Sequence, residues 1–319
     1  MHLSAPQKNV LETELYFKNT SIQNIGGYMC FEKEIDYDTM NKAYNQLLKN
    51  ADGLRIKITR SNNEYSQEIK EYKYEKLENV GNIEDIDSTC DRWMRIPFNV
   101  YEKMYAFRFF KHKGKCGLSI ILHHLISDAW SITLVVSRLL EYYDSFLSNK
   151  EVPESLPSYN LFLEKEQEYL KSDKFLKDEK YWDEKFNEKP AFVSFAKNHA
   201  IKNPVGNRKY YKIEKSFRDK IEKYCLDNSI SVPIFFEAIL AVYGARTNNQ
   251  DEITLCSLGL NRSSYTLKNT IGNFSNILPM RVKIDWNESF LKLCKNISSE
   301  HFDLFSRFNL IAWINRHIG

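Results

Sequence analysis

The sequence predicts an α/β protein with two related lobes, for three reasons. Helical and extended patterns alternate through both halves of the 319 residues. This length is sufficient for two domains of ordinary size, each with a core of its own. A polar stretch with two prolines, residues 148–157, separates the halves and is typical of a linker. We therefore expect a first lobe at residues 1–157, and two linker helices with a second lobe at residues 158–319.

The elements of the first half follow from caps, turns and apolar periodicity. A helix over residues 4–18 would have Ser4 as its cap and Pro6 in its first turn. Asp36 is expected to cap a helix that continues to about residue 49. Strands are expected at residues 28–33, 54–60, 64–71, 105–112 and 116–123, and further helices at 83–95 and 128–147.

The second half alternates in the same way. Two amphipathic helices are expected at residues 158–171 and 173–186, directly after the linker. Strands are then expected at residues 209–214, 252–258 and 280–285, and helices at 216–228, at 232–246 and from residue 288 onward.

The composition is that of a soluble globular protein, with 43% hydrophobic and 27% charged residues. The 45 basic and 42 acidic residues are interspersed and leave a net charge of +3, so no basic stripe indicates nucleic-acid binding. Six cysteines lie far apart without a Cys-x-x-Cys pair, which argues against structural zinc and disulfides. The N-terminus has no signal-peptide pattern and no run has membrane-spanning length, so we expect a cytoplasmic protein without a membrane partner.

The most informative stretch is an apolar run, residues 117–122, that leads into two adjacent histidines. His123 and His124 end this predicted strand, and Ser127 or Asp128 would cap the helix that follows. Successive strand residues point to opposite faces of a sheet, so the two imidazoles are poorly placed to share one metal ion. We expect no metal site, one catalytic histidine, and a second histidine that supports it through a hydrogen bond. The alternative is a buried histidine pair beside an ordinary capping aspartate.

This stretch resembles the His-His-x-x-x-Asp-Gly motif of the condensation domains of nonribosomal peptide synthetases, whose superfamily includes chloramphenicol acetyltransferase. Residues 259–262 (Gly-Leu-Asn-Arg) and 271–281 (Ile-Gly-Asn-Phe-Ser-Asn-Ile-Leu-Pro-Met-Arg) are similar to the family's Asn-Arg and Ile-Gly-x-Phe-x-Asn-x-Leu-Pro-x-Arg segments. Residues 3–7 resemble the family's opening Leu-Ser-x-x-Gln, and residues 158–163 and 181–182 resemble its linker elements. The resemblance covers the whole chain.

The resemblance implies two chloramphenicol acetyltransferase-like lobes, each an α+β two-layer sandwich, arranged as a V-shaped pseudo-dimer. In the family the second lobe continues with several more strands after the segment that matches residues 271–281. We therefore expect the second lobe of this chain to be incomplete. The missing part normally includes a strand that helps to cover the active-site tunnel.

The activity that the resemblance implies is peptide-bond formation in the synthesis of secondary metabolites. An acyl or peptidyl thioester on one carrier protein would be attacked by the amine of an aminoacyl thioester on another. The implied partners are carrier proteins and neighbouring synthetase domains, and phosphopantetheine would arrive on the carriers rather than bind to the chain itself. Two alternatives use the same fold: a stand-alone O- or N-acyltransferase that takes its acyl group from CoA or a carrier, and a catalytically silent platform that docks carriers. An epimerisation domain shares the histidine motif, but residues 259–262 look more like the condensing branch.

The resemblance also suggests residue roles. His124 matches the catalytic position, as a general base or as the group that orients the attacking amine. Asp128 would form a structural ion pair with Arg262, although a triad-like role for the carboxylate and a solvated surface arginine are the alternatives. Ala129 replaces the family's glycine, and we expect at most a slightly narrower passage for the pantetheine arm.

The remaining candidates are expected to support the site or line the tunnel; they are His123, Asn273, Ser275 and Asn276. The two asparagines could instead hold a turn. We expect Trp130 to pack in the core rather than contact substrate.

Overall fold

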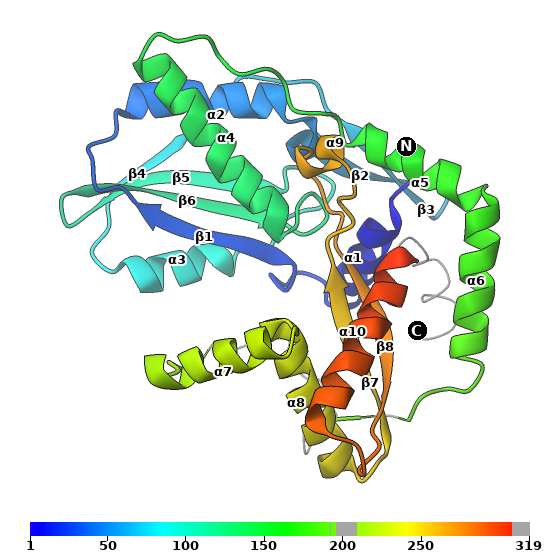
Figure 1. The fold of residues 1–319 in the computed structure, drawn as a ribbon. Helices are drawn as coiled ribbons and strands as arrows, with labels where there is room; N and C mark the ends of the chain where they lie inside the picture. The colour runs from blue at the N-terminus through cyan, green and yellow to red at the C-terminus, as the bar shows by residue number, and fades with distance from the viewer. Residues whose placement is uncertain (192, 196–208, 308–319) are drawn as a thin grey trace. The chain divides into compact units, whose positions relative to one another are not determined.

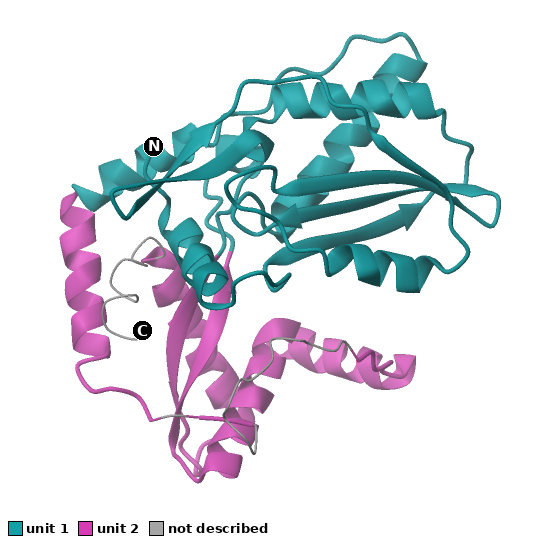
Figure 2. Ribbon diagram, turned by 180° about the vertical axis from the view of Figure 1, so that it is seen from behind, with its two compact units in different colours: residues 1–171, 260–275 teal, residues 172–259, 276–319 magenta. Residues whose placement is uncertain are grey.

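The computed structural model describes residues 1–191, 193–195 and 209–307. Its chain forms two compact units, coloured separately in Figure 2: residues 1–171 with 260–275, and residues 172–259 with the chain from 276 onward. The first unit thus includes the segment 260–275, which the predicted boundary at residue 157 assigns to the second domain. That domain boundary remains a prediction.

The first unit is built on a mixed four-stranded sheet with the strand order β1-β6-β5-β4. Strand β6 pairs antiparallel with β1 and with β5, whereas β4 pairs parallel with β5. The strands are β1 (Asn24–Cys30), β4 (Glu78–Asn82), β5 (Tyr105–His112) and β6 (Lys115–His123). Every residue of β6 after Lys115 is buried, because this inner strand is covered on both faces of the sheet. The predicted apolar strand before the two histidines is therefore confirmed.

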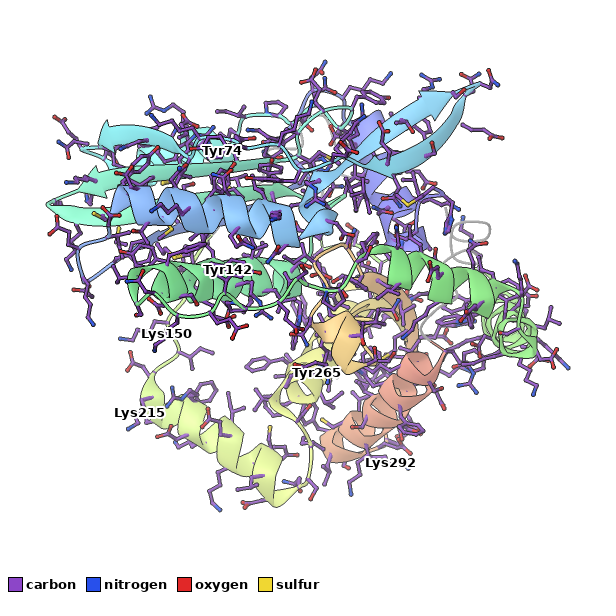
Figure 3. The ribbon with its side chains drawn as sticks, turned by 90° about the horizontal axis from the view of Figure 1, so that it is seen from above. Tyr74, Tyr142, Lys150, Lys215, Tyr265 and Lys292 are labelled. Carbon is purple, nitrogen blue, oxygen red and sulfur yellow. The ribbon has the colours of Figure 1, made fainter. Side chains whose placement is uncertain are left out.

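Two helices, α2 (Tyr37–Asn50) and α4 (Ala129–Leu147), cover one face of this sheet, and α3 (Ile86–Met94) lies on the other (Figure 1). Figure 3 shows α2 and α4 side by side, with Tyr142 on α4. Tyr142 is fully buried, and its hydroxyl accepts a hydrogen bond from the Asn50 side chain at 3.1 Å. The core of the unit lies between these helices and the sheet.

Three shorter groups of elements complete the first unit. Helix α1 (Ala5–Tyr16) begins at Ser4, whose hydroxyl accepts the Gln7 N–H in a capping box, as expected. The hairpin β2 (Ile56–Ser61) and β3 (Glu64–Ile69) follows the 3₁₀ turn Asp52–Arg55. Helix α5 (Asn160–Leu170) lies directly before the second unit in sequence. Helix α9 (Tyr265–Lys268) lies in the segment 260–275, which separates the two parts of the second unit in sequence.

The second unit contains the antiparallel pair β7 (Glu252–Gly259) and β8 (Asn276–Lys283). Helices α8 (Val232–Asn248) and α10 (Phe290–Ser306) pack against each other and against these strands. Two further helices are α6 (Asp173–Lys185) and α7 (Lys215–Asp227). No single helix in the described ranges is long and apolar enough to cross a membrane. Helices α7 and α8, with a bend of 101° between them, are together long and apolar enough by length and composition alone.

The strand predicted at residues 209–214 is wrong: the structure has no regular element there. Tyr210 and Tyr211 in this range have high β-propensity, but both side chains are more than 80% exposed. Aromatic residues favour a strand where they pack on the surface of a sheet, and residues 209–214 belong to none of the described sheets. Two elements of the structure were not predicted: β4, a polar edge strand without apolar alternation, and the short helix α9.

Candidate active site

The two adjacent histidines lie where β6 ends and the turn to α4 begins. The His123 N–H donates to the Met104 carbonyl at 2.9 Å, and the His124 N–H donates to the Gln23 carbonyl at 2.8 Å. Met104 precedes β5 and Gln23 precedes β1, the two neighbours of β6 in the sheet. Successive N–H groups therefore donate to opposite sides, as in an extended chain, which is the backbone geometry that directs successive side chains to opposite faces.

His123 uses both ring nitrogens inside the protein. Its Nδ1 accepts the Leu125 N–H at 3.1 Å, so the ring proton is on Nε2, which faces Glu14 Oε2 at 3.4 Å. His123 is 1% exposed, and its ring forms a T-shaped contact with the Phe98 ring. Because its imidazole is buried and bonded on both sides, His123 is suited to hold the turn rather than to meet a substrate.

His124 is less deeply buried than His123, and its ring is not tied in this way. Burial lowers the pKa of the His124 imidazole below its ordinary value of 6.5, and the nearby Asp128 charge opposes this effect in part. The side chain is therefore a neutral imidazole at pH 7, able to accept a proton or to orient a donor.

Asp128 is fully buried and caps α4, with the Ser131 N–H donating to its Oδ1 at 2.8 Å. Arg262 Nη2 lies 3.0 Å from Oδ1 and 3.1 Å from Oδ2, so the predicted ion pair is confirmed. The Phe274 N–H donates to Oδ2 at 3.1 Å, and the Ser275 hydroxyl lies at 3.4 Å from the same oxygen. These donors occupy both oxygens, which favours a structural role over a triad-like contact with histidine.

Both terminal nitrogens of Arg262 are held by groups of the first unit. Its Nη1 donates to the carbonyls of Leu267 and Thr270 at 2.6 and 2.7 Å, and its Nη2 donates to the Ser131 hydroxyl at 2.7 Å. The guanidinium lies over the Phe274 ring, with Cζ 3.9 Å from the ring centroid. Burial lowers the pKa of Arg262, and the Asp128 carboxylate counteracts this, so the guanidinium stays charged at neutral pH. The side chain is only 2% exposed, which excludes the solvated surface arginine.

The other four predicted site residues lie in different surroundings from one another. Ala129 is the exposed first residue of α4, an ordinary helical position where a methyl group fits. Ser275 contacts Asp128 as described above, and the buried Asn273 accepts the Tyr159 hydroxyl with its backbone carbonyl at 2.7 Å. Asn276 is buried in the second unit, where it begins β8 opposite Gly259. The structure therefore brings Asp128, Arg262 and Ser275 into one set of contacts at the start of α4, whereas His123 is bonded separately to Glu14 and Leu125.

The expectation for Trp130 is wrong. This side chain is 38% exposed, on the surface of α4 rather than in the core. Its Nε1 donates to the Lys268 carbonyl at 2.8 Å, at the end of helix α9. An indole with a polar N–H satisfies that group at the protein surface more easily than in an apolar core.

Sequence reasoning missed several buried groups around the ion pair. The Ser131 hydroxyl accepts the Gly272 N–H at 3.1 Å and lies 2.7 Å from the Gly272 carbonyl. A Cβ on Gly272 would lie 2.1 Å from the Tyr159 ring, so only glycine fits there. Tyr159 itself is fully buried, and burial raises the pKa of its hydroxyl well above the ordinary value. The matches at residues 158–163 and 271–281 contained Tyr159 and Gly272, but no local pattern shows that they touch.

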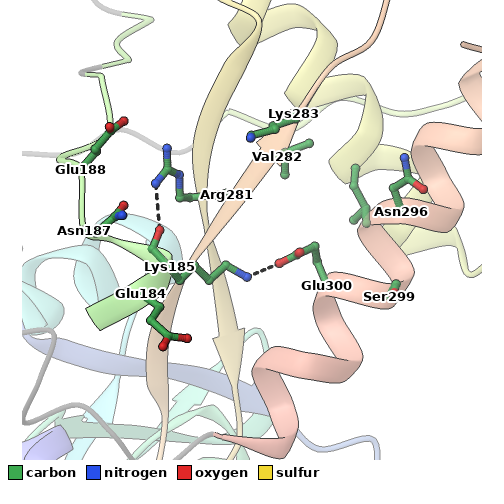
Figure 4. A pocket seen from close by; sticks show the side chains of 11 residues that line it. Glu184, Lys185, Asn187, Glu188, Arg281, Val282, Lys283, Asn296, Ser299 and Glu300 are labelled. Carbon is green, nitrogen blue, oxygen red and sulfur yellow. Dashed lines mark hydrogen bonds and ion pairs between the residues drawn. The ribbon is translucent and has the colours of Figure 1, made fainter. Parts of the chain in front are cut away.

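We find no second site with comparable chemistry among the residues that the structure describes. Within the described ranges, no group of three or more His, Cys, Asp or Glu side chains is placed to hold a metal ion. A cavity of about 710 Å³ in the second unit is lined by the end of α6, by β8 and by α10 (Figure 4). There Lys185 pairs with Glu300, and Arg281 donates to the Lys185 carbonyl at 2.8 Å. Its charged lining is largely engaged within the unit, so we assign it no reaction.

Comparison with known proteins agrees with this arrangement. The sequence model of the family described as "Condensation domain" matches residues 1–307, so the chain belongs to the condensation domain family. Surfactin synthase subunit 1 of Bacillus subtilis (strain 168) is 26% identical over 92% of this chain, and bacitracin synthase 2 of Bacillus licheniformis is 23% identical over 95%. The chain spans about a tenth of these curated relatives, 9% and 12% of their lengths.

Solved structures show the same fold. The first condensation domain of the CDA synthetase superposes with a TM-score of 0.82 at 16% identity, with 97% of this chain and 76% of that chain covered. The SgcC5 protein from Streptomyces globisporus gives a TM-score of 0.83 at 17% identity, with 99% and 77% covered. The predicted α/β fold class, that of the chloramphenicol acetyltransferase-like condensation domains, is therefore confirmed.

Proposed function

We propose that this chain is an acyltransferase that joins a carrier-tethered acyl or peptidyl thioester to the amine of a carrier-tethered aminoacyl thioester. The observation that carries the proposal is the position of His124, a half-buried imidazole directly after β6, at a turn that the buried Asp128–Arg262 pair holds in place. Membership of the condensation domain family and the similarity to surfactin synthase and bacitracin synthase support this reaction over unrelated histidine chemistry.

The reaction needs little activation of the electrophile, because a thioester is already reactive. An α-amine has a pKa near 8, so a useful fraction is neutral at working pH. As the amine nitrogen bonds to the thioester carbonyl carbon, His124 accepts or orients the amine proton. The C–S bond then breaks, and the departing thiolate takes up a proton to leave a free carrier thiol. General-base assistance of this kind contributes about 10²- to 10⁴-fold, and positioning of the two substrates contributes at least as much.

The other site residues have supporting roles in this proposal. The Asp128–Arg262 pair fixes the start of α4 and the segment that contains Asn273 and Ser275. The buried His123 holds the turn from inside. Ala129, exposed at the start of α4, is proposed to face the passage for the pantetheine arm.

The proposed partners are carrier proteins and the neighbouring domains of a peptide synthetase, and the proposed location is the cytoplasm. Phosphopantetheine would enter on the carriers, and no resident cofactor is needed for the acyl transfer itself. The curated relatives are much longer chains by comparison, which supports a partner role for adjacent domains.

The test is an amide-formation assay with two loaded carrier proteins, one with an acyl or peptidyl thioester and one with an aminoacyl thioester. We expect a condensed product on the acceptor carrier, detected by mass spectrometry, and its loss in His124→Ala. His112→Ala is the matched control, because His112 lies on β5 and its Nδ1 contacts the Ile83 carbonyl at 3.0 Å instead. Product from CoA thioesters alone would indicate a stand-alone acyltransferase, and carrier binding without product would indicate a docking platform.

A further inference from the structure

The peptide groups that follow His124 are held from two directions. The Leu125 N–H donates to His123 Nδ1 at 3.1 Å, and the Leu125 carbonyl accepts from Gln7 Nε2 at 3.1 Å. The next amide, that of Ile126, donates to the His123 carbonyl at 3.0 Å. Leu125 and Ile126 are both fully buried. The backbone on the C-terminal side of the His124 Cα therefore has one permitted orientation, which limits where the His124 ring can point.

Gln7 reaches this carbonyl from helix α1, and a second glutamine on β3 holds it there. Gln7 Nε2 donates to Gln67 Oε1 and Gln67 Nε2 donates to Gln7 Oε1, both at 2.8 Å, so the two amides form a reciprocal pair. Gln7 Oε1 also accepts the Ser4 N–H at 3.0 Å, and Gln67 Nε2 also donates to the His2 carbonyl at 2.7 Å. Gln7 and Gln67 are 0% and 1% exposed.

This pattern leaves the Gln7 amide a single orientation. Its two N–H groups are used by Gln67 and Leu125, and its oxygen accepts from Ser4 and Gln67. A flipped amide would place its oxygen against the Leu125 carbonyl and lose both donors. Satisfied buried networks of this kind are rigid, because any rearrangement leaves a desolvated polar group without a partner.

We propose that the buried Gln7–Gln67 amide pair is a positioning device for His124. Through the Leu125 carbonyl it holds the turn between β6 and α4, so that the imidazole stays aligned with the acceptor amine. The inference rests on the proposed function, since it assigns two positioning residues to that site. Gln7 and Gln67 themselves are fully buried and do not contact substrate.

The test variant is Gln7→Met, which keeps the length of the side chain and removes its donors. We expect kcat for amide formation to fall about tenfold or more, because an error of about 1 Å in the placement of a catalytic group costs as much as a hundredfold. KM for the loaded carriers should change less than about twofold, since carrier docking is not involved. Hydrogen exchange of the peptide that covers residues 121–128 should become faster. Gln67→Met should act in the same direction with a smaller effect, because Gln7 stays but is no longer held.

Asn45→Leu is the matched control, because Asn45 is also a buried amide of the first unit, 7% exposed. Its side chain makes four hydrogen bonds, as Gln7 does, but to residues 41, 72 and 75 rather than to the turn. We expect this control to lower the melting temperature without changing kcat or exchange at residues 121–128. Equal kcat for Gln7→Met and Asn45→Leu, with unchanged exchange in this peptide, would overturn the proposal. If the wild-type chain forms no amide bond, the proposed function fails, while the exchange data still decide whether the glutamine pair holds the turn.

Discussion

Removing the Asp128 carboxylate tests the central structural claim about this site. In Asp128→Ala, the Arg262 guanidinium keeps its carbonyl partners but loses its counter-charge in a place where its side chain is 2% exposed. Breaking a buried pair on one side costs about 3–5 kcal/mol, and the lost helix cap adds about 1 kcal/mol. The total is a large part of the roughly 5–15 kcal/mol that stabilises a typical domain. We therefore expect a poorly soluble or largely unfolded first unit rather than a well-folded, slow enzyme.

Hydrogen exchange of the β6 amides is the suitable measurement, because these buried positions exchange through opening of the first unit. A loss of about 4 kcal/mol speeds their exchange by about three orders of magnitude. Asp91→Ala is the control, since Asp91 forms an exposed pair with Arg95 four residues later, worth about 0–1 kcal/mol. Equal exchange rates of the β6 amides in the two variants would contradict a stabilising role of the buried pair.

A second variant separates the charge from the cap. Replacing both partners, as Asp128→Asn with Arg262→Met, removes the unpaired charge and keeps a capping side chain. We expect this double variant to recover much of the stability lost in Asp128→Ala. If it is no more stable than Asp128→Ala, the unpaired guanidinium is not the cause of the loss.

Four further predictions concern His124 and the glycine beside Tyr159. His124→Ala should keep the wild-type melting temperature within a few degrees and lose amide formation by about 10²- to 10⁴-fold; near-full activity would contradict its role. Because the pKa of His124 is lowered by burial, its NMR titration midpoint should lie below 6.5, and a midpoint above 6.5 would be inconsistent. As the pH falls, His124 is protonated in the unfolded chain at a higher pH than in the folded chain. The unfolding free energy should therefore decrease as the pH drops from 6.5 through the folded pKa, and this pH dependence should be weaker in His124→Ala. Gly272→Ala should destabilise by about 1–3 kcal/mol in chemical denaturation, whereas Gly27→Ala, with no atom within 4 Å of its Cβ, should change little; equal effects would refute the steric argument.

The local elements around the site could be predicted from the sequence because their signals are short-range. Ser4, Asp36 and Asp128 each accept a backbone N–H three residues later, so their side chains mark helix starts without reference to the rest of the fold. The apolar run likewise predicted the strand β6, and the structure shows that both of its faces are covered. The edge strand β4 was not predicted, because its polar side chains form no buried face. A strand was wrongly predicted at residues 209–214, because propensity alone cannot supply a neighbouring strand.

The sequence by itself determined the family, the helix caps and the pair of charged residues around which the site is built. Asp128 and Arg262 lie 134 residues apart, and only the resemblance to a known motif suggested that they meet. The tertiary structure decided which groups surround them: Ser131 against Gly272, Tyr159 against Gly272, and Gln7 against Gln67 and Leu125. Such contacts leave no periodic trace, because a buried polar group is tolerated wherever folding brings it a partner, however distant in the chain.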